Sequence, residues 1–248
     1  MTNELFPKER KGHQATRSPW HLVGVWVVLA LPVARAGVAS ALVFGGPHPY
    51  ENIPLSVVGV ILAAWLIGAH AFMLAKPEFC QGWLKKLPRH YNAGVYTLGF
   101  GMLWFWLLVA PDDIGGSFSF LSALTMDIGE FNAVKPYLRI AVPVAYIGMV
   151  LYVREFLFVR GLGVVALMVA SPLLEAAFLK DPSTRLLVPI FGYILLTKGL
   201  FWVGMPFTFR DAVTWATASD QRWRVLAFAG IGYGVAVLTC TLLFWRGY

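Results

Sequence analysis

Long apolar segments are the feature of this sequence that most restricts its fold. Seven of them, each 18 to 25 residues long, follow one another along the 248 residues. They cover residues 20–44, 53–75, 93–110, 137–157, 161–179, 186–206 and 223–245. A helix needs about 20 mostly apolar residues to cross roughly 30 Å of hydrocarbon. Because the alternating pattern of a membrane β-barrel is absent, the sequence predicts an all-α, polytopic membrane helix bundle with about seven transmembrane helices.

Charge content excludes other classes of protein. Only 13% of the residues are charged, whereas a soluble domain has about 25%, so a water-soluble protein with a single core is excluded. The net charge of +7 does not indicate nucleic-acid binding, because the basic residues are spread over several loops. The expected partners are the lipid bilayer and other membrane subunits or a second copy of the chain.

The positions of Lys and Arg predict the orientation. Of the 20 basic residues, 13 fall on the side of the N-terminus and five on the opposite side, while Arg35 and Lys198 lie inside segments. Cytoplasmic loops carry the excess of Lys and Arg. We therefore expect a cytoplasmic N-terminus and an outer C-terminus, as in a multi-pass protein of a bacterial-type inner (cytoplasmic) membrane.

Tryptophans at the ends of the segments agree with this orientation. Trp20, Trp83, Trp215 and Trp223 lie at predicted inner boundaries, and Trp245 and Tyr248 lie at the outer one. Amphipathic rings are enriched at the level of the lipid headgroups.

The domain organisation is simple. Residues 1–19 are polar and are predicted to be a disordered cytoplasmic tail, and residues 20–248 form a single transmembrane helical domain. An alternative for the first segment is a cleaved secretory signal, because a basic start, an apolar stretch and Ala34-Arg35-Ala36 resemble one. The apolar character continues to Phe44, which favours a retained helix.

Two loops are predicted to contain further helices, and one connection is predicted to be a sharp turn. Residues 111–136 are too apolar for a free loop and too short to span twice, so we expect an interfacial helix or re-entrant loop on the outer face. Residues 207–221 are a second candidate, on the inner face. A turn at residues 158–160 would join the fourth and fifth spans as a hairpin.

Three ionisable residues inside the segments are the main candidates for a functional site. A charge in hydrocarbon costs about 2.5 to 3.5 kcal/mol on insertion scales, so each is a functional hypothesis. Arg35 lies roughly 15 Å from the outer end of its segment, Lys198 roughly 12 Å from the inner end of its segment, and Glu175 near an outer end. Glu175 is expected to neutralise Arg35 or Lys198. The pair is either structural, which we favour, or leaves the other cation to meet an anionic substrate or to relay a proton.

Two weaker groups of candidates remain. His21, His70 and His90 all lie near the cytoplasmic side and could ligate a heme or a metal ion, although no spacing motif supports this. Asp127 and Glu130, at i and i+3 in the outer loop, could bind a divalent cation, but solvated acids are common there. No cofactor is favoured.

Three functions are consistent with these features, and the absence of a catalytic constellation argues against an enzyme. The first is a non-catalytic subunit or assembly factor of a membrane complex. Pairs of small residues that permit close helix contact favour it: Ala64 with Gly68, Ala166 with Ala170, and Gly230 with Gly234.

The second function is transport of a small anion or a proton, using Arg35, Glu175 and Lys198. Helix-kinking prolines favour it: Pro32, Pro143, Pro172 and Pro189. The third function is a b-type heme redox subunit that uses the histidines. The sequence shows no convincing internal repeat, which disfavours the inverted-repeat transporters.

Overall fold

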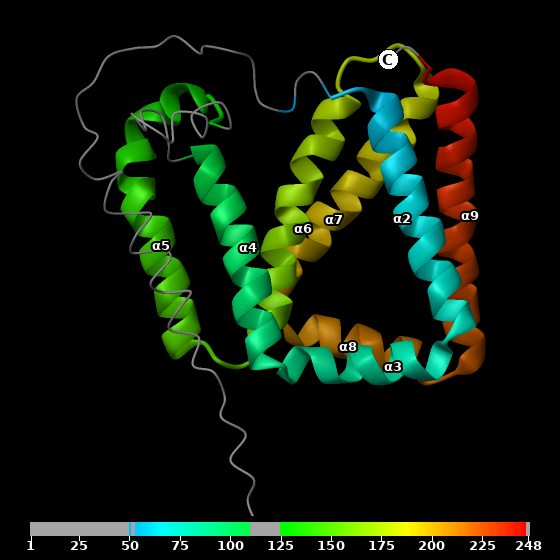
Figure 1. Cartoon of the computed structure of the whole chain (residues 1–248), viewed down its shortest axis with the longest axis horizontal. Coiled ribbons are helices and arrows are strands. Elements are labelled where there is room, and N and C mark those ends of the chain that lie inside the picture. Colours follow the sequence, from blue (N-terminus) through cyan, green and yellow to red (C-terminus); the bar gives the residue numbers. More distant parts are fainter. Residues whose placement is uncertain (1–49, 51–52, 110–124, 247–248) are drawn as a thin grey trace, which may run out of the picture.

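The computed structural model describes residues 50, 53–109 and 125–246, and every regular element in these ranges is a helix. In chain order the elements are α2 (Leu55–Ala75), α3 (Pro77–Lys86), η1 (Leu87–Arg89), α4 (Tyr91–Val109), η3 (Gly129–Val134), α5 (Lys135–Tyr152), α6 (Leu157–Ala176), η4 (Ser183–Leu186), α7 (Leu187–Gly204), α8 (Phe207–Ala216) and α9 (Asp220–Phe244), where η marks a 3-10 helix. Figure 1 shows the long helices side by side, with α3 and α8 lying across one end.

Six helical stretches are long and apolar enough to cross a membrane: α2, α4, α5 with η3, α6, α7 with η4, and α9. The α-helices of these stretches match six of the seven predicted segments to within five residues at either end. The predicted first segment, residues 20–44, lies outside the described residues, as do the predicted tail and most of the predicted outer helix 111–136. The described part of that loop leads into α5 through η3.

The connection between α5 and α6 differs from the predicted one. It comprises residues 153–156, and residues 158–160, the predicted turn, belong to α6. Phe156 takes a left-handed conformation (φ 56°), which separates the two helices. Arg160 is the last residue of the predicted turn, where it would lie at the membrane boundary. In the structure its Nη1 donates to the Val203 carbonyl oxygen of α7 (2.5 Å), so it belongs to the α6–α7 contact. The predicted hairpin turn was therefore placed too late in the chain.

Two ten-residue helices, α3 and α8, lie across the same ends of the long helices (Figure 1). The position of α8 agrees with the predicted inner helix 207–221, whereas α3 was not predicted. Pro77 is the first residue of α3, and Pro206 directly precedes α8. Proline suits a helix start because the N–H that it lacks has no partner within the helix there.

Glycines set the closest contacts between the long helices. In the antiparallel pair α2 and α9, a Cβ on Gly234 would lie 2.8 Å from Cγ1 of Ile67. In the pair α6 and α7, Gly163 and Gly199 face each other, and a Cβ on Gly163 would lie 2.8 Å from the Gly199 carbonyl oxygen. These distances leave no room for a side chain, so the glycines bring the backbones together, as small residues do in membranes. Of the predicted small-residue pairs, Ala64 and Gly68 are exposed and contact no described helix closely.

The helices form two groups that meet at the end opposite α3 and α8. α6 packs between α4 and α7, α5 packs on α4, and α2 pairs with α9. A buried cluster that includes Leu55, Leu62, Leu173, Val188 and Trp245 joins the two groups. From this cluster α2 and α7 diverge toward α3 and α8 (Figure 1). The cluster therefore holds the half of the bundle that lies away from α3 and α8 together more tightly than the half next to them.

A repeated plan relates α2–α3–α4 to α7–α8–α9. Both α2 and α7 end at a cap residue with nearly the same backbone angles, Lys76 (φ −134°, ψ 66°) and Met205 (φ −127°, ψ 70°). Each cap N–H donates to the carbonyl oxygen four residues earlier, on Phe72 and Phe201 respectively. A short helix follows in each unit, and a long helix then returns.

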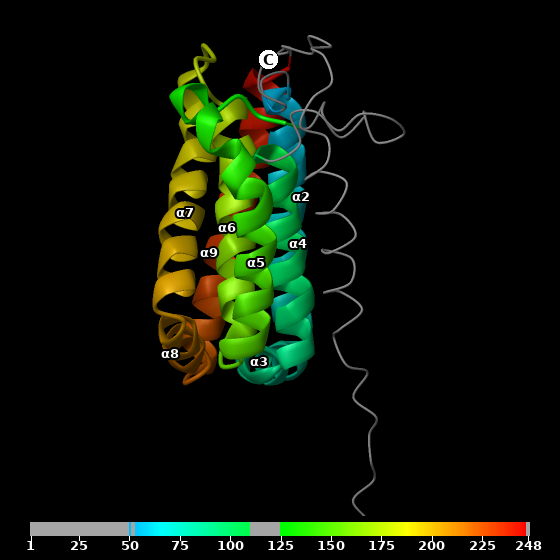
Figure 2. The same cartoon turned by 90° about the vertical axis from the view of Figure 1, so that its left-hand side faces the viewer.

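The two units also agree in spacing and direction. Tyr91, the first residue of α4, comes 14 residues after Pro77, and Asp220, the first residue of α9, comes 14 after Pro206. α3 and α8 run in opposite directions in Figure 1, and Figure 2 shows both at the same end of the bundle. The two units therefore share an order of elements, but their long helices pack differently: α2 pairs with α9, whereas α6 lies between α4 and α7. The sequence alone did not indicate this repeat.

Candidate functional site

Lys198 has an unusual position in its helix. Among the described residues it is the one Lys, Arg, Asp or Glu that lies more than five residues from both ends of its helix. It comes 11 residues after the first residue of α7 and six before the last, or about 16 Å and 9 Å along the helix axis. The side chain is exposed in the isolated chain.

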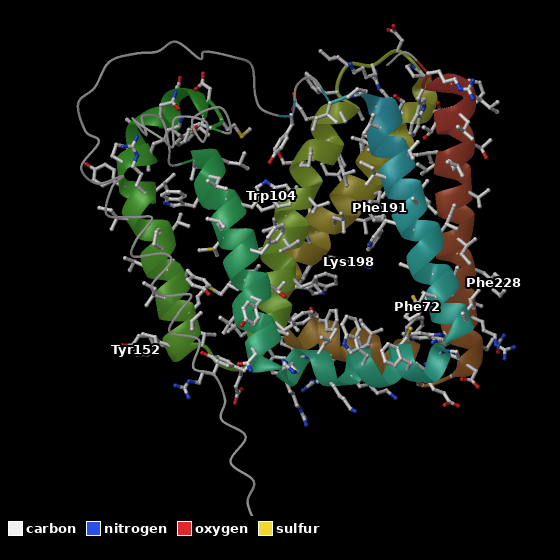
Figure 3. The ribbon with its side chains drawn as sticks, viewed as in Figure 1. Phe72, Trp104, Tyr152, Phe191, Lys198 and Phe228 are labelled. Carbon is white, nitrogen blue, oxygen red and sulfur yellow. The ribbon has the colours of Figure 1, made fainter. Side chains whose placement is uncertain are left out.

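The surroundings of Lys198 show which side of α7 it occupies. Phe191, seven residues earlier and so on the same side, makes an edge contact with Trp65 of α2 (6.2 Å between ring centroids). Trp202, four residues later, packs against Phe209 of α8 (5.3 Å between centroids). Lys198 thus lies between an aromatic contact to α2 and another to α8, and Figure 3 shows it on the side of α7 that faces α2.

The predicted partner of Lys198 is not beside it. Glu175 is the second-last residue of α6, so it lies about 15 Å from Lys198 along the bundle axis. Neither residue forms an ion pair with any other residue in the described part of the chain. Arg35, the other predicted partner of Glu175, lies outside the described residues.

The described residues offer no carboxylate at the depth of Lys198. The described acids lie in connections, in α3 or α8, or at the end of a spanning helix: Glu78, Asp127, Glu130, Glu155, Glu175, Asp181, Asp211 and Asp220. The other acids all lie outside the predicted first segment: Glu4, Glu9, Glu51, Asp112 and Asp113. Neither the described residues nor the predicted first segment places a carboxylate beside Lys198 at its own depth, and another molecule can supply one.

The histidines have local roles in the described structure. His70 donates from Nδ1 to the Leu66 carbonyl oxygen one turn earlier (2.7 Å), and its ring packs against Gly230 of α9. His90 accepts a hydrogen bond at Nδ1 from the Ala93 N–H (3.2 Å) at the start of α4. Within the described ranges no three His, Cys, Asp or Glu residues are grouped as metal ligands would be. His21, the third predicted ligand, is not among the described residues.

The outer acidic pair is also explained by local structure. Asp127 Oδ1 accepts hydrogen bonds from the Gly129 N–H (2.8 Å) and from Asn132 Nδ2 (2.6 Å), and so caps η3. Gly129 has φ 59°, a conformation that glycine adopts without strain. Glu130 is exposed within the same turn. Asp127 therefore has a local structural role at the start of η3, through bonds to residues two and five positions later and not through its i, i+3 spacing with Glu130.

Indole N–H groups join helices at positions that the sequence placed at membrane boundaries. Trp223 is 3% exposed and donates to the Met73 carbonyl oxygen of α2 (3.0 Å). Trp245 is buried and donates to Thr184 Oγ1 (2.9 Å). Both residues lie at an end of α9, as expected of boundary positions, but their rings are buried and their N–H groups find acceptors inside the bundle. Trp83 and Trp215, on α3 and α8, are exposed as expected.

Arg160 is an important contact that sequence reasoning missed. Its bond to Val203 satisfies a carbonyl oxygen near the end of α7, where a helix has no further N–H of its own to offer. A signal existed in the sequence in Gly161 and Gly163, two small residues after Arg160 that in the structure contact different helices, α4 and α7 respectively. Such glycines favour a helix contact around Arg160 and not a turn.

The structure defines the class of protein: an all-helical chain with six described helices that can span a membrane. Comparison with models of known families, with curated proteins and with solved structures found no match.

Proposed function

We propose that this chain is a non-catalytic subunit of a membrane complex, with its N-terminus in the cytoplasm and its C-terminus outside, in a membrane of the bacterial inner type. The observation that carries the proposal is Lys198, an exposed cation inside a spanning helix, with no carboxylate at the same depth among the described residues. Such a side chain is costly against lipid. A partner subunit that covers α7 would remove that cost.

The surface around Lys198 supports the same proposal. The stretch of η4 and α7 is the least buried of the six spanning stretches: 17% of the residues in its apolar part are buried, against 39% for α4 and for α6. Its exposed residues include Ile190, Ile194 and Phe201, which recur at helical spacing. Packing of a further helix on this face is therefore sterically open.

Purification of the tagged full-length chain from its native membrane in a mild detergent tests the proposal. We expect the chain to elute with at least one other polypeptide in fixed stoichiometry, as measured by light scattering and mass spectrometry. Lys198→Met should lose that companion, whereas Lys180→Met, in the connection between α6 and α7, should keep it. A monodisperse monomer without companions contradicts the proposal.

A second candidate function is transport of a small anion, and the repeated plan of the fold favours it. In transporters built from repeats, the substrate site lies near the midplane between the repeats. Lys198 lies on the side of α7 that faces α2, its counterpart in the other unit. Purified protein in phosphatidylcholine vesicles should then carry chloride or phosphate, and Lys198→Met should abolish the flux. Absence of flux in the unmodified protein counts against this candidate.

A further inference from the structure

We infer that the Lys198 face of α7 binds a transmembrane helix of a different protein, and that this helix carries an Asp or Glu at the depth of Lys198. The inference rests on the proposed function and specifies the chemistry of the partner. We define the Lys198 face as Lys198 with the exposed residues of α7 beside it: Ile190, Ile194, Thr197 and Phe201.

The shape of the Lys198 face suits a helix. Ile190, Ile194, Thr197 and Phe201 follow one another at intervals of three or four residues, so they form one stripe along α7, and Lys198 lies beside this stripe, four residues after Ile194. The four residues of the stripe are apolar or have their polar group occupied, since Thr197 Oγ1 donates to the Tyr193 carbonyl oxygen of the same helix (2.8 Å). The Lys198 face therefore offers one charged group in an apolar surface, as in recognition of a helix by packing and one polar contact.

Charge complementarity selects the occupant. A second copy of this chain would bring another Lys198 and, among the described residues, no carboxylate at that depth. The predicted first segment of this chain, residues 20–44, contains Arg35 and no acid, so it would add a positive charge. Another molecule can supply the anionic group, and a helix supplies it together with the apolar area that covers the rest of the stripe.

The position of Lys198 also sets the depth of the partner's carboxylate. Lys198 lies about 9 Å from the inner end of α7 and about 16 Å from its outer end. Trp202 and Phe209 pack together between Lys198 and α8, so an aromatic contact lies on the direct path from Lys198 to the inner surface. We therefore expect the acid of the partner to lie in the inner half of its own span, about six residues from its inner end.

A designed peptide tests the chemistry without knowledge of the partner. The probe is a Leu/Ala transmembrane peptide of about 20 residues, with one Glu six residues from its inner end, and the control peptide has Gln in its place. Both are mixed with the full-length protein in phosphatidylcholine vesicles, and association is measured by energy transfer between fluorophores. We expect the Glu peptide to bind about tenfold more tightly than the Gln peptide.

Variants of the protein assign any preference to Lys198. Lys198→Met should bind both peptides equally, Lys198→Arg should retain the preference for Glu, and Lys180→Met should behave as the unmodified protein does. Lys198→Glu should reverse the preference toward a peptide with Lys at the same position. Circular dichroism and elution volume check that each variant is folded, and the Arg and Glu variants keep the test decisive if the Met variant is not.

Three results overturn the inference. One is equal binding of the Glu and Gln peptides to the unmodified protein. Another is a preference for Glu that persists in Lys198→Met. The third is a preference that disappears in phosphatidylglycerol vesicles, which would show that an anionic headgroup satisfies Lys198 in place of a helix.

The same experiments separate this inference from the proposed function. If the chain purifies from its membrane as a monomer but shows the Glu preference, the proposed function fails and the chemistry of the face stands. If it purifies in a complex that survives Lys198→Met and shows no Glu preference, the subunit role stands and the inference fails.

Discussion

At the scale of single residues, aromatic donors hold the helices in register. The N–H of Trp104 donates to the Tyr50 hydroxyl (2.6 Å), and the hydroxyl of Tyr91 donates to the Val150 carbonyl oxygen (2.9 Å). Tyr233 donates in the same way to the Leu187 carbonyl oxygen (2.5 Å). Each bond joins two different parts of the chain, and a buried donor without an acceptor is costly in a membrane. These bonds therefore specify which turns of neighbouring helices lie opposite each other.

Trp223 provides a test of this idea. Trp223→Phe keeps most of the ring but removes the hydrogen bond to Met73, so we expect a loss of about 1 kcal/mol in the free energy of unfolding. Unfolding in a mixture of mild detergent and dodecyl sulfate measures it. Trp83→Phe is the matched control, because Trp83 is 54% exposed on α3, and it should cost less than half as much. Equal losses for the two variants would show that the indole N–H of Trp223 has no special role.

Cys80 gives a prediction for pH dependence. Cys80 is a residue of α3 that is 7% exposed, and this burial raises the pKa of its thiol. A raised pKa means less thiolate at any pH below it, and the thiolate is the reactive form. The Cys240→Ser protein presents Cys80, and the Cys80→Ser protein with Lys85→Cys presents an exposed cysteine at position 85. A charged maleimide should react with Cys80 more slowly than with the cysteine at position 85. The rate for Cys80 should continue to rise at a pH where that of the exposed cysteine has levelled off, and identical pH profiles would contradict the burial of Cys80.

At the scale of elements, the α6–α7 contact depends on two glycines that face each other. A Cβ on Gly199 would lie 2.9 Å from the Gly163 carbonyl oxygen, and helix backbone cannot move away cheaply. We expect Gly199→Leu to lower stability by about 3 kcal/mol or to prevent folding. Gly232→Leu on α9 is the control, because a Cβ there would meet no described atom within 4 Å. Thermal unfolding in detergent compares them, and tolerance of Leu at position 199 would argue against the close α6–α7 crossing.

The spanning helices were predictable from the sequence because lipid imposes a length and an apolar composition on each of them. The short helix α3 was not, because Pro77, Glu78 and a Lys pair at its end make it look like a polar loop. Its signal was the spacing of Phe79, Cys80 and Trp83, which places them on one side of a helix that starts at a proline.

The repeat escaped sequence reasoning for a related reason. When the two units are superposed by their prolines, few residues are identical: the pairs are Ile61 with Ile190, Leu66 with Leu195, Phe72 with Phe201, Pro77 with Pro206, and Gly101 with Gly230. Lipid requires only that a residue be apolar, so equivalent helices can differ at most positions. The shared features are caps and lengths, which are visible only in the folded chain.

The candidate site was predicted in part. Depth along a helix follows directly from sequence position, so Lys198 and Glu175 were identified as intramembrane charges. Their pairing was not predictable, because it depends on how far α6 and α7 slide past each other and on which side each residue takes. The structure places Glu175 near one end of α6 and Lys198 well within α7, and this separation is the reason for assigning Lys198 an external partner.

At the scale of the whole molecule, the described charges are asymmetric. Nine Lys and Arg residues lie at the end of the bundle with α3 and α8: Lys76, Lys85, Lys86, Arg89, Arg154, Arg160, Arg210, Arg222 and Arg224. Five lie at the opposite end: Lys135, Arg139, Lys180, Arg185 and Arg246. Because cytoplasmic loops carry the excess of Lys and Arg, this distribution favours an orientation with α3 and α8 at the cytoplasmic surface.

The number of membrane crossings links this orientation to the predicted first segment, residues 20–44. The six described spans are an even number, so the start of α2 and the end of α9 are expected on the same side of the membrane, and the charge distribution favours the outer side. If residues 20–44 add a seventh crossing, an N-terminal tag is protected and a C-terminal tag is digested when protease is added to sealed cells. If that segment does not cross, both tags are digested together, and if it is a cleaved signal the N-terminal tag is missing from the mature chain. We expect the first result. A cysteine introduced by Ser183→Cys, in the connection between α6 and α7, should be labelled from outside, and one introduced by Lys85→Cys should be protected. Labelling of Lys85→Cys alone would show the reverse orientation.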